Sequence, residues 1–131
     1  FRFLDIYFSN KGYSLVSGIR TKRQDNFIKV LSSKIANKIR SYILNDSCPD
    51  TGCSLKIFDK DIFLKFPLFE GLHRFLPALF IGYGYINFNI SVNHRPRTRG
   101  SSKYGTFDRL FKGIRHIILV KKIINNIKDV K

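Results

Sequence analysis

Two polar segments of the sequence concentrate the residue types that bind anions. Segment 18–25 (GIRTKRQD) carries Arg20, and segment 94–105 (HRPRTRGSSKYG) carries three arginines, two serines and a lysine. Guanidinium groups match phosphate oxygens as bidentate donors, and hydroxyls with free backbone amides complete a cradle for a polyanion. A solvated basic loop explains segment 18–25 equally well, whereas the density of segment 94–105 favours an anion site.

A third segment, 50–56 (DTGCSLK), places a carboxylate directly before a glycine turn. Asp50 in this position can act as a general base, or it can orient a hydroxyl or phosphate acceptor. The commoner role of an isolated Asp beside a turn is to accept hydrogen bonds from nearby backbone amides. Both interpretations stay open from these residues alone.

A fourth segment, 67–79 (PLFEGLHRFLPAL), surrounds His73 and Arg74 with apolar side chains. One hypothesis is an amphipathic element at a membrane interface, with Arg74 near lipid phosphates. The alternative for His73 is a hydrogen-bonded structural histidine. The sequence shows neither a zinc-type His/Cys cluster nor a Ser/His/Asp arrangement, and we expect Cys48 and Cys53 to be small buried thiols.

The charge balance indicates either an anionic partner or a tolerance for self-repulsion, and part of the basic excess can also reflect a generally Lys-rich composition. The chain has 24 Lys and Arg against 9 Asp and Glu, a formal net charge of +15. Nucleic acid, an anionic membrane surface or a phosphorylated small molecule would each fit this charge. A hydrophobic content of 44% with 13 Phe excludes a disordered basic tail, and the apolar runs are too short to span a bilayer. A small basic nucleic-acid-binding domain is the alternative function, although Phe in apolar runs suits a core better than a base-stacking surface.

Apolar periodicity and turn residues predict an alternation of strands and helices. Helices are expected up to residue 10, from 27, over 71–81 and from 107, with one or two helical turns over 60–66. Strands are expected over 13–17, 54–58 and 85–92, and a polar loop over 18–24. This order predicts an α/β sheet. Three short strands, and a sequence without Met, predict that an N-terminal part is missing.

Several motifs in a fixed order resemble family 2 glycosyltransferases. They are 50–56, 67–79, 92–97 (VNHRPR) and 100–105 (GSSKYG), with 16–20 (VSGIR), Arg23, Asp25, Ser33 and Asn37 matching as well. The branch is the one similar to dolichol-phosphate mannose synthase and bacterial polyprenyl-phosphate sugar transferases. The resemblance runs from about residue 12 to about residue 122. It implies the C-terminal portion of a GT-A fold, with the N-terminal nucleotide-binding half missing.

The resemblance also implies a reaction. Such enzymes move a sugar from a nucleotide-diphosphate sugar to a polyprenyl phosphate, usually with Mg²⁺ or Mn²⁺. In that family the metal-binding Asp-x-Asp motif lies before the stretch that is matched here, and residues 1–17 do not supply it. We therefore expect no metal ligand in this chain and no activity from this part alone. The expected location is peripheral, on the cytoplasmic face of an anionic membrane, with no nucleic acid partner. A remnant that folds only as an interaction module is a third hypothesis.

The resemblance assigns roles to individual positions. Asp50 is the expected catalytic residue, which would help to position the acceptor phosphate, and Lys56 stands where mannose synthases often have Arg. The residues expected to bind donor or acceptor phosphates are Arg20, Lys29, Arg97, Ser102 and Lys103. Those expected on the acceptor and membrane side are His73, Arg74 and Arg95. Residues 1–106 are predicted to be a partial catalytic domain and residues 107–131 a basic amphipathic C-terminal helix.

Overall fold

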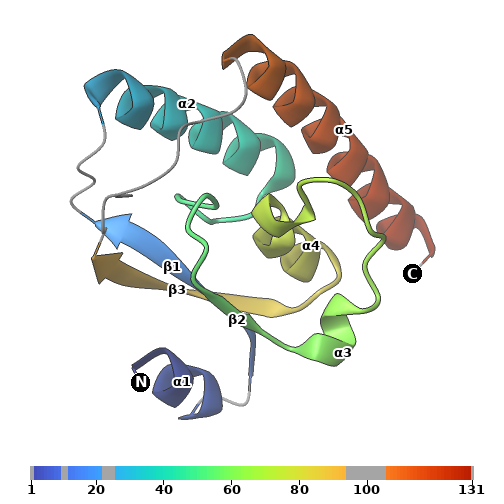
Figure 1. Cartoon of the computed structure of the whole chain (residues 1–131). Helices are drawn as coiled ribbons and strands as arrows, with labels where there is room; N and C mark the ends of the chain where they lie inside the picture. Colours follow the sequence, from blue (N-terminus) through green and yellow to red (C-terminus); the bar gives the residue numbers. More distant parts are fainter. Residues whose placement is uncertain (1, 10–11, 22–25, 94–105, 131) are drawn as a thin grey trace.

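Figure 1 shows the structure of the chain, a computed structural model that describes residues 2–9, 12–21, 26–93 and 106–130. Five α-helices, one 3₁₀ helix and three strands are found in these ranges. In chain order they are α1 (Arg2–Ser9), β1 (Tyr13–Thr21), α2 (Phe27–Leu44), β2 (Lys56–Phe58), α3 (Lys60–Phe63), η1 (Leu72–Arg74), α4 (Leu76–Gly82), β3 (Ile86–Asn93) and α5 (Thr106–Val130).

The three strands form one sheet in the order β2-β1-β3, with β1 in the centre. β3 runs parallel to β1 as far as the pair Thr21↔Asn93, and β2 is antiparallel to β1. Parallel neighbours need a long crossover connection, and here that connection contains α2 and α4. The predicted α/β class is therefore confirmed.

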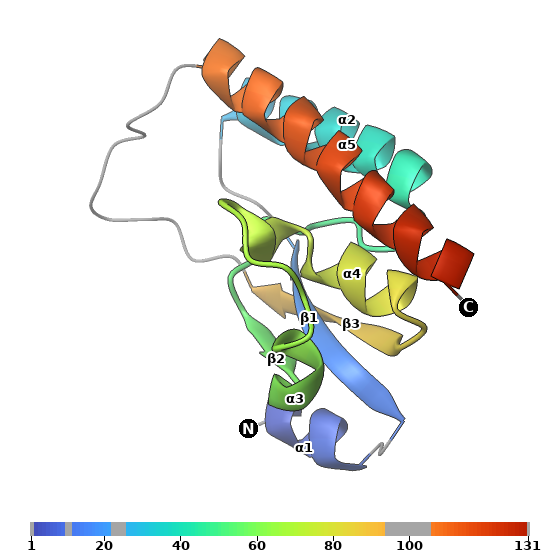
Figure 2. The ribbon, with the colours of Figure 1, turned by 90° about the vertical axis from the view of Figure 1, so that its right-hand side faces the viewer.

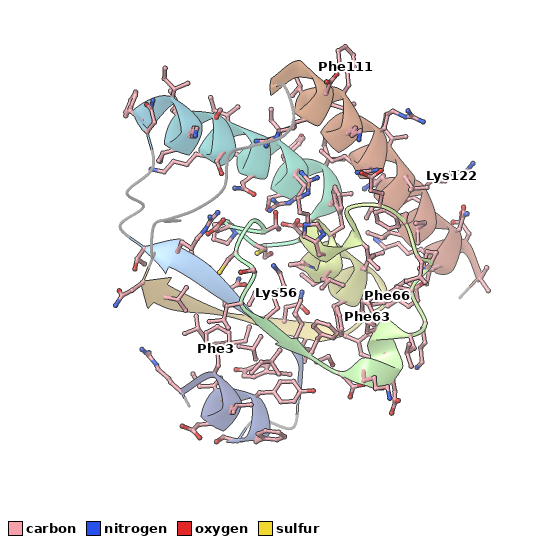
Figure 3. All side chains as sticks on the ribbon, in the orientation of Figure 1. Phe3, Lys56, Phe63, Phe66, Phe111 and Lys122 are labelled. Carbon is pink, nitrogen blue, oxygen red and sulfur yellow. The ribbon has the colours of Figure 1, made fainter. Side chains whose placement is uncertain are left out.

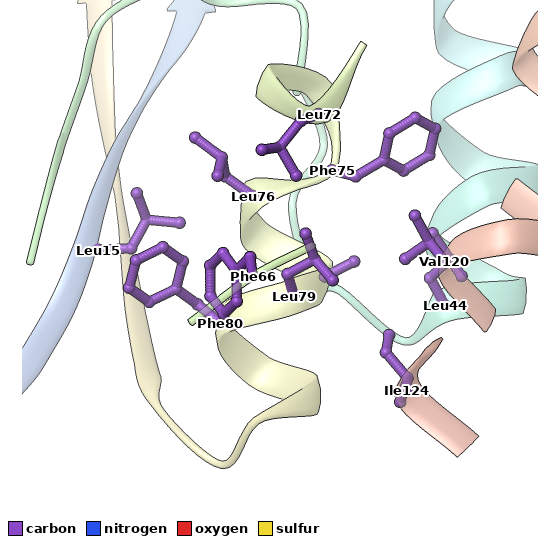
Figure 4. Packing of buried hydrophobic residues seen from close by; sticks show 11 residues of the cluster. Leu15, Leu44, Phe66, Leu72, Phe75, Leu76, Leu79, Phe80, Val120 and Ile124 are labelled. Carbon is purple, nitrogen blue, oxygen red and sulfur yellow. The ribbon is translucent and has the colours of Figure 1, made fainter. Parts of the chain in front are cut away.

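The hydrophobic core lies between the sheet and the helices. In Figure 2, α4 lies between the sheet and α5. Figure 4 shows how Leu15 from β1, Phe80 from α4 and Val120 from α5 meet in this layer, where all three are fully buried. Gly82 permits the close approach of α5, because a Cβ atom there would lie 2.6 Å from Cγ1 of Ile124.

Segment 67–79 contributes most of its apolar side chains to this core. Leu72, Phe75, Leu76 and Leu79 are buried in it, while Leu68 is exposed. The expected single helix over 71–81 divides into η1 and α4, and Pro77 lies in the first turn of α4, where its missing N–H costs nothing. The apolar character of this segment is thus largely used in packing, and His73 and Arg74 lie outside the core.

One local prediction is wrong. The sequence predicts a strand that ends at residue 17 and a loop over 18–24, but β1 continues to Thr21. The pairing with β3 extends through Gly18↔Ile90 and Arg20↔Val92, so backbone hydrogen bonds in the ladder hold these residues extended. Arg20 therefore projects from the end of a strand and not from a loop.

Helix α2 turns polar side chains toward the core and apolar side chains outward, and in this sense it is inverted relative to a usual surface helix. An amphipathic helix normally turns its apolar stripe toward the core. The inward positions of α2 instead include the polar residues Asn37 and Arg40, with Leu44 at the end. Its predicted apolar stripe is exposed, with exposed fractions between 37% for Ile43 and 90% for Tyr42. The exposed members are Phe27, Ile28, Leu31, Ile35, Ile39, Tyr42 and Ile43.

Helix α5 adds a second exposed apolar row. It buries Val120 and Ile124 against the rest of the molecule and lies beside α2, where Lys121 Nζ donates to the carbonyl of Ile43 (3.0 Å). Its exposed large apolar residues are Leu110, Phe111, Ile114, Ile118, Leu119 and Val130. Within the described residues, neither helix is sufficiently long and apolar to cross a bilayer.

The core makes a stability prediction. Replacing Phe80 by Ala should lower the free energy of unfolding by about 3–5 kcal/mol, because the ring is fully buried and a cavity would remain. Phe111→Ala is the control, since that ring is 67% exposed, and it should change the value by less than about 0.5 kcal/mol. Urea unfolding followed by circular dichroism measures both. Equal effects of the two substitutions would contradict the placement of the core.

Candidate functional site

The centre of the candidate site is an ion pair between Arg20 and Asp50. Arg20 donates from Nε to Oδ2 (2.8 Å) and from Nη2 to Oδ1 (2.8 Å) of the Asp50 carboxylate. The backbone N–H of Arg20 donates to Oδ2 as well (3.1 Å). Two parallel N–H···O bonds of this kind fix both the distance and the plane of the guanidinium group. The structure thus brings together two of the predicted site residues, thirty positions apart in the sequence.

Two glycines make room for this pair. Gly52 lies under the guanidinium group, since a Cβ atom there would stand 2.9 Å from Nη2 of Arg20. At Gly18 a Cβ atom would meet the Cys53 sulfur at 2.9 Å, so the missing side chain lets the 50–55 segment close onto β1. The backbone N–H of Gly18 donates to the carbonyl of Leu55 (2.9 Å), which continues the pairing beyond β2.

The turn that carries Asp50 is fixed from α2 by a buried arginine. Arg40 is only 5% exposed, and its Nε donates to Oδ2 of Asp46 (2.6 Å). Its Nη1 donates to Oγ1 of Thr51 (2.6 Å) and to Oδ1 of Asn37, and its Nη2 donates to the carbonyl of Cys48. A charge can be buried at this depth only when it is paired and hydrogen-bonded, and both conditions are met.

Sequence reasoning missed Arg40, Asp46 and Thr51. Asp46 makes the contact of an Asx turn, because its Oδ1 accepts from the N–H of Cys48 (3.1 Å). A signal for the network was present in α2, where Asn37, Arg40 and Leu44 share one helical face. The partner of that face lies in a loop, whose conformation has no comparable periodicity.

A second cation holds the same turn from β2. Lys56, labelled in Figure 3, donates from Nζ to the carbonyl oxygens of Thr51 (3.2 Å) and Cys53. Burial lowers the pKa of the Lys56 ammonium group, because desolvation disfavours its charged form. The neighbouring thiol groups are free and buried, as predicted, and burial raises the pKa of Cys48.

The surroundings of Asp50 are positively charged. The fields of Arg20 and Asp50 both act on Lys56, and the field of Lys56 acts on His73. The pKa of His73 is lowered, first by burial and then by the charges of Arg74 and Lys56, so its neutral form is favoured. Arg20 and Lys56 are thus the two cations beside Asp50 among the residues named from the sequence, and Lys56 also acts on His73.

The remaining predicted residues fall elsewhere. Lys29 is exposed in the first turn of α2, where its carbonyl accepts from Oγ of Ser32 (3.2 Å). The predicted phosphate-loop residues Arg95, Arg97, Ser102 and Lys103 lie outside the described residues.

The metal ion that the resemblance implies does not fit the described part of the site. No group of three or more His, Cys, Asp or Glu side chains that could hold a metal is found over residues 2–9, 12–21, 26–93 and 106–130. The carboxylate at the centre of the candidate site, that of Asp50, is bound by Arg20 through both of its oxygens. Ligands for Mg²⁺ or Mn²⁺ are therefore not supplied by this set of side chains.

Comparison with curated proteins gives several related enzymes. Undecaprenyl-phosphate 4-deoxy-4-formamido-L-arabinose transferases from Shewanella sediminis and Aeromonas hydrophila are 29% and 28% identical to the chain, over 74% and 72% of its length and 29% of theirs. Dodecaprenyl-phosphate galacturonate synthase from Rhizobium johnstonii is 34% identical over 81% of the chain and 32% of that enzyme. No family model and no solved structure matches the chain.

The chain is a relative of polyprenyl-phosphate sugar transferases. This confirms the resemblance that the ordered motifs predict. The chain spans about 30% of the length of the curated relatives that it matches. The described structure is a mixed α/β unit with a small three-stranded sheet, which is compatible with part of a larger domain.

The Arg20–Asp50 ion pair predicts that the carboxylate of Asp50 contributes more to the free energy of unfolding than an exposed carboxylate does. Asp50→Asn should lower the free energy of unfolding by about 1.5–3 kcal/mol, because charge-assisted hydrogen bonds to Arg20 are lost. Asp61→Asn is the matched control at an exposed position and should change it by less than about 0.5 kcal/mol. Urea unfolding at pH 7 compares the two variants. An Asp50→Asn variant as stable as the control would contradict a stabilising ion pair between Arg20 and Asp50.

Proposed function

We propose that this chain forms the acceptor side of a glycosyltransferase that moves a sugar from a nucleotide-diphosphate sugar to a polyprenyl phosphate. The observation that carries the proposal is the Arg20–Asp50 pair within a basic neighbourhood, in a chain similar to enzymes named for undecaprenyl and dodecaprenyl phosphate. Asp50 holds the guanidinium group, and the group in turn offers a fixed positive charge to a phosphate.

The chemistry needs this arrangement because two anions must meet. An oxygen of the acceptor phosphate attacks the anomeric carbon of the sugar, and the nucleoside diphosphate leaves. Cations fixed before the substrates arrive neutralise the phosphates without further reorganisation. Arg20 supplies such a charge from the end of β1. Mg²⁺ or Mn²⁺ belongs to the proposal for the complete enzyme, with ligands outside the described residues of this chain.

The GT-A fold is part of the same proposal. The central strand β1 has neighbours on both sides, whereas the outer edge of β3 has no strand partner among the described residues. Ile86 and Phe88 on β3 are 58% and 36% exposed. An edge strand of eight residues whose outer backbone groups have no strand partner among the described residues is suited to further pairing, which supports a larger sheet that continues from β3.

Attachment to the surface of an anionic membrane completes the proposal. The inverted α2 and the neighbouring α5 expose two apolar rows, and basic residues accompany both. A groove of about 560 Å³ between them is lined by Ile39, Ile43, Ile114, Ile117, Ile118, Lys121, Lys122, Asn125, Asn126 and Asp129. Apolar insertion with basic side chains near lipid phosphates is the physical basis of peripheral binding. The proposed side is the cytoplasmic face, where the acceptor phosphate would be reached.

The activity is tested in a chimera, because the chain matches only about a third of the length of its relatives. This chain replaces the matched segment of the Rhizobium johnstonii dodecaprenyl-phosphate galacturonate synthase, and the formation of dodecaprenyl-phosphate galacturonate is measured. We expect activity in the chimera, and a loss of about a hundredfold in kcat/KM after Asp50→Asn or Arg20→Met. The chain by itself should give no product.

Asp61→Asn in the chimera is the control and should keep the starting activity. A folded chimera without activity would overturn the proposed function. Unchanged rates in both the Asp50 and Arg20 variants would overturn the assignment of the site.

Membrane attachment is tested with vesicles. The chain should sediment with phosphatidylglycerol vesicles, and the double variant Leu31→Gln/Ile35→Gln should weaken binding at least about tenfold, because two exposed apolar side chains no longer enter the bilayer. Ala36→Gln, which is also exposed on α2, is the control and should bind like the parent. Equal binding by both variants, or salt-sensitive binding to duplex DNA without vesicle binding, would contradict a membrane role and favour a nucleic-acid partner.

A further inference from the structure

We propose that Arg40 and Lys56 are positioning residues of the acceptor-phosphate site, which hold the turn that presents Asp50 to Arg20 through contacts to Thr51. The inference rests on the proposed function, because it takes the site at Arg20 and Asp50 to be the one that binds the acceptor phosphate. Neither cation is assigned to bind the phosphate directly. Each acts on the residue that follows Asp50 in the chain.

Thr51 is the point at which the two cations meet. Its Oγ1 accepts from Nη1 of Arg40 (2.6 Å), and its carbonyl oxygen accepts from Nζ of Lys56 (3.2 Å). Thr51 is 4% exposed and Asp50 is 6% exposed, so water has little access to this turn. Arg40 on α2, before Thr51 in the chain, fixes the Thr51 side chain. Lys56 on β2, after Thr51, fixes the Thr51 backbone carbonyl.

The guanidinium group of Arg40 is itself immobilised. Asp46 accepts from its Nε at 2.6 Å and from its Nη2 at 3.4 Å, and Asn37 accepts from its Nη1. Asn37 is in turn oriented by a hydrogen bond from its Nδ2 to Oγ of Ser33 (3.3 Å), one helical turn earlier. The orientation in which the Arg40 guanidinium group donates to Thr51 is therefore fixed by Asp46 and by residues of α2.

One buried cation, Arg40, and one partly buried cation, Lys56, hold this turn, and their burial is unfavourable in itself. Removing an ammonium or guanidinium group from water is unfavourable unless other contacts compensate, and the lowered pKa of Lys56 shows this cost of burial. The Asx contact of Asp46 bends the chain earlier, at Cys48. What the cations add is a fixed place for Thr51, and so for the carboxylate one residue before it that aligns Arg20.

A positioning role and a merely structural role predict different results for a folded protein. If the cations only stabilise the fold, a variant that remains folded binds phosphate with unchanged affinity. If they position Asp50, the affinity falls although the fold is kept. The test therefore compares dissociation constants under conditions where circular dichroism shows every variant fully folded.

The variant that isolates the contact is Thr51→Val, which removes the hydroxyl group but keeps the Arg40–Asp46 pair and the backbone carbonyl. The probe is farnesyl phosphate, a soluble prenyl phosphate, added to the full chain and followed by calorimetry. We expect the dissociation constant to rise about tenfold. Arg40→Lys, which loses the forked geometry, should show a similar rise, while Lys56→Arg should keep the parent affinity because it can still donate to Thr51.

Two controls separate positioning from stability. Ser54→Ala changes an exposed residue of the same segment, and Ile124→Val weakens the core far from the turn; both should leave the dissociation constant unchanged. An unchanged affinity in folded Thr51→Val would overturn the inference. So would a rise of the same size in Ile124→Val, because the effect would then follow stability alone.

A second measurement keeps the two proposals apart. The NMR signal of the Arg20 Nε–H group reports its hydrogen bond to Asp50 without any ligand. If the parent chain does not bind farnesyl phosphate, the proposed acceptor site fails, and the signal decides the positioning role. A shifted or broadened signal in Thr51→Val, but not in Ser54→Ala, supports positioning, and an unchanged signal overturns it.

Discussion

The burial of the Arg40 guanidinium group determines much of the rest of the structure. A cation at 5% exposure requires an anionic partner and further hydrogen-bond acceptors, and these are the Asp46 carboxylate, the Thr51 hydroxyl and the Cys48 carbonyl in the segment after α2. To reach them, α2 must turn its polar face inward. Its apolar stripe is then left outward, which accounts for the inverted helix. One buried charge thus connects the orientation of a surface helix with the conformation of the turn at Asp50.

The two sides of α2 correspond to the two ends of the proposed acceptor. A polyprenyl phosphate has an anionic head and a long apolar tail, and the proposed function requires the protein to meet both. The inward face of α2 supports the turn beside Arg20, where a phosphate would bind. The outward face joins α5 in an apolar surface with basic residues around it. A lipid-linked substrate gives a physical reason for placing these opposite properties on one helix.

The core explains why other apolar residues do not form such a surface. Phe75, Leu79 and Phe80 fill the space between sheet and α5, so segment 67–79 stabilises the fold, although its composition alone also suits a membrane element. The single-layer sheet is small, and the outer edge of β3 has no strand partner among the described residues. Together with the match to about 30% of longer relatives, this edge supports the proposal that the unit works as part of a larger domain.

The positions of most elements, the dominant charges and the family that the motifs resemble can be predicted from the amino-acid sequence, because these depend on local periodicity and on residue identity. The helix that begins at residue 27 and the strand near residues 85–92 follow from such patterns. Three features become visible in the folded chain alone: α2 turns Arg40 inward, Arg20 lies on a strand, and Thr51 is bound by two cations. Periodicity shows that a helix has two faces, but which face turns inward depends on partners distant in the chain. The Arg20–Asp50 contact crosses thirty positions, and no local pattern encodes such a distance.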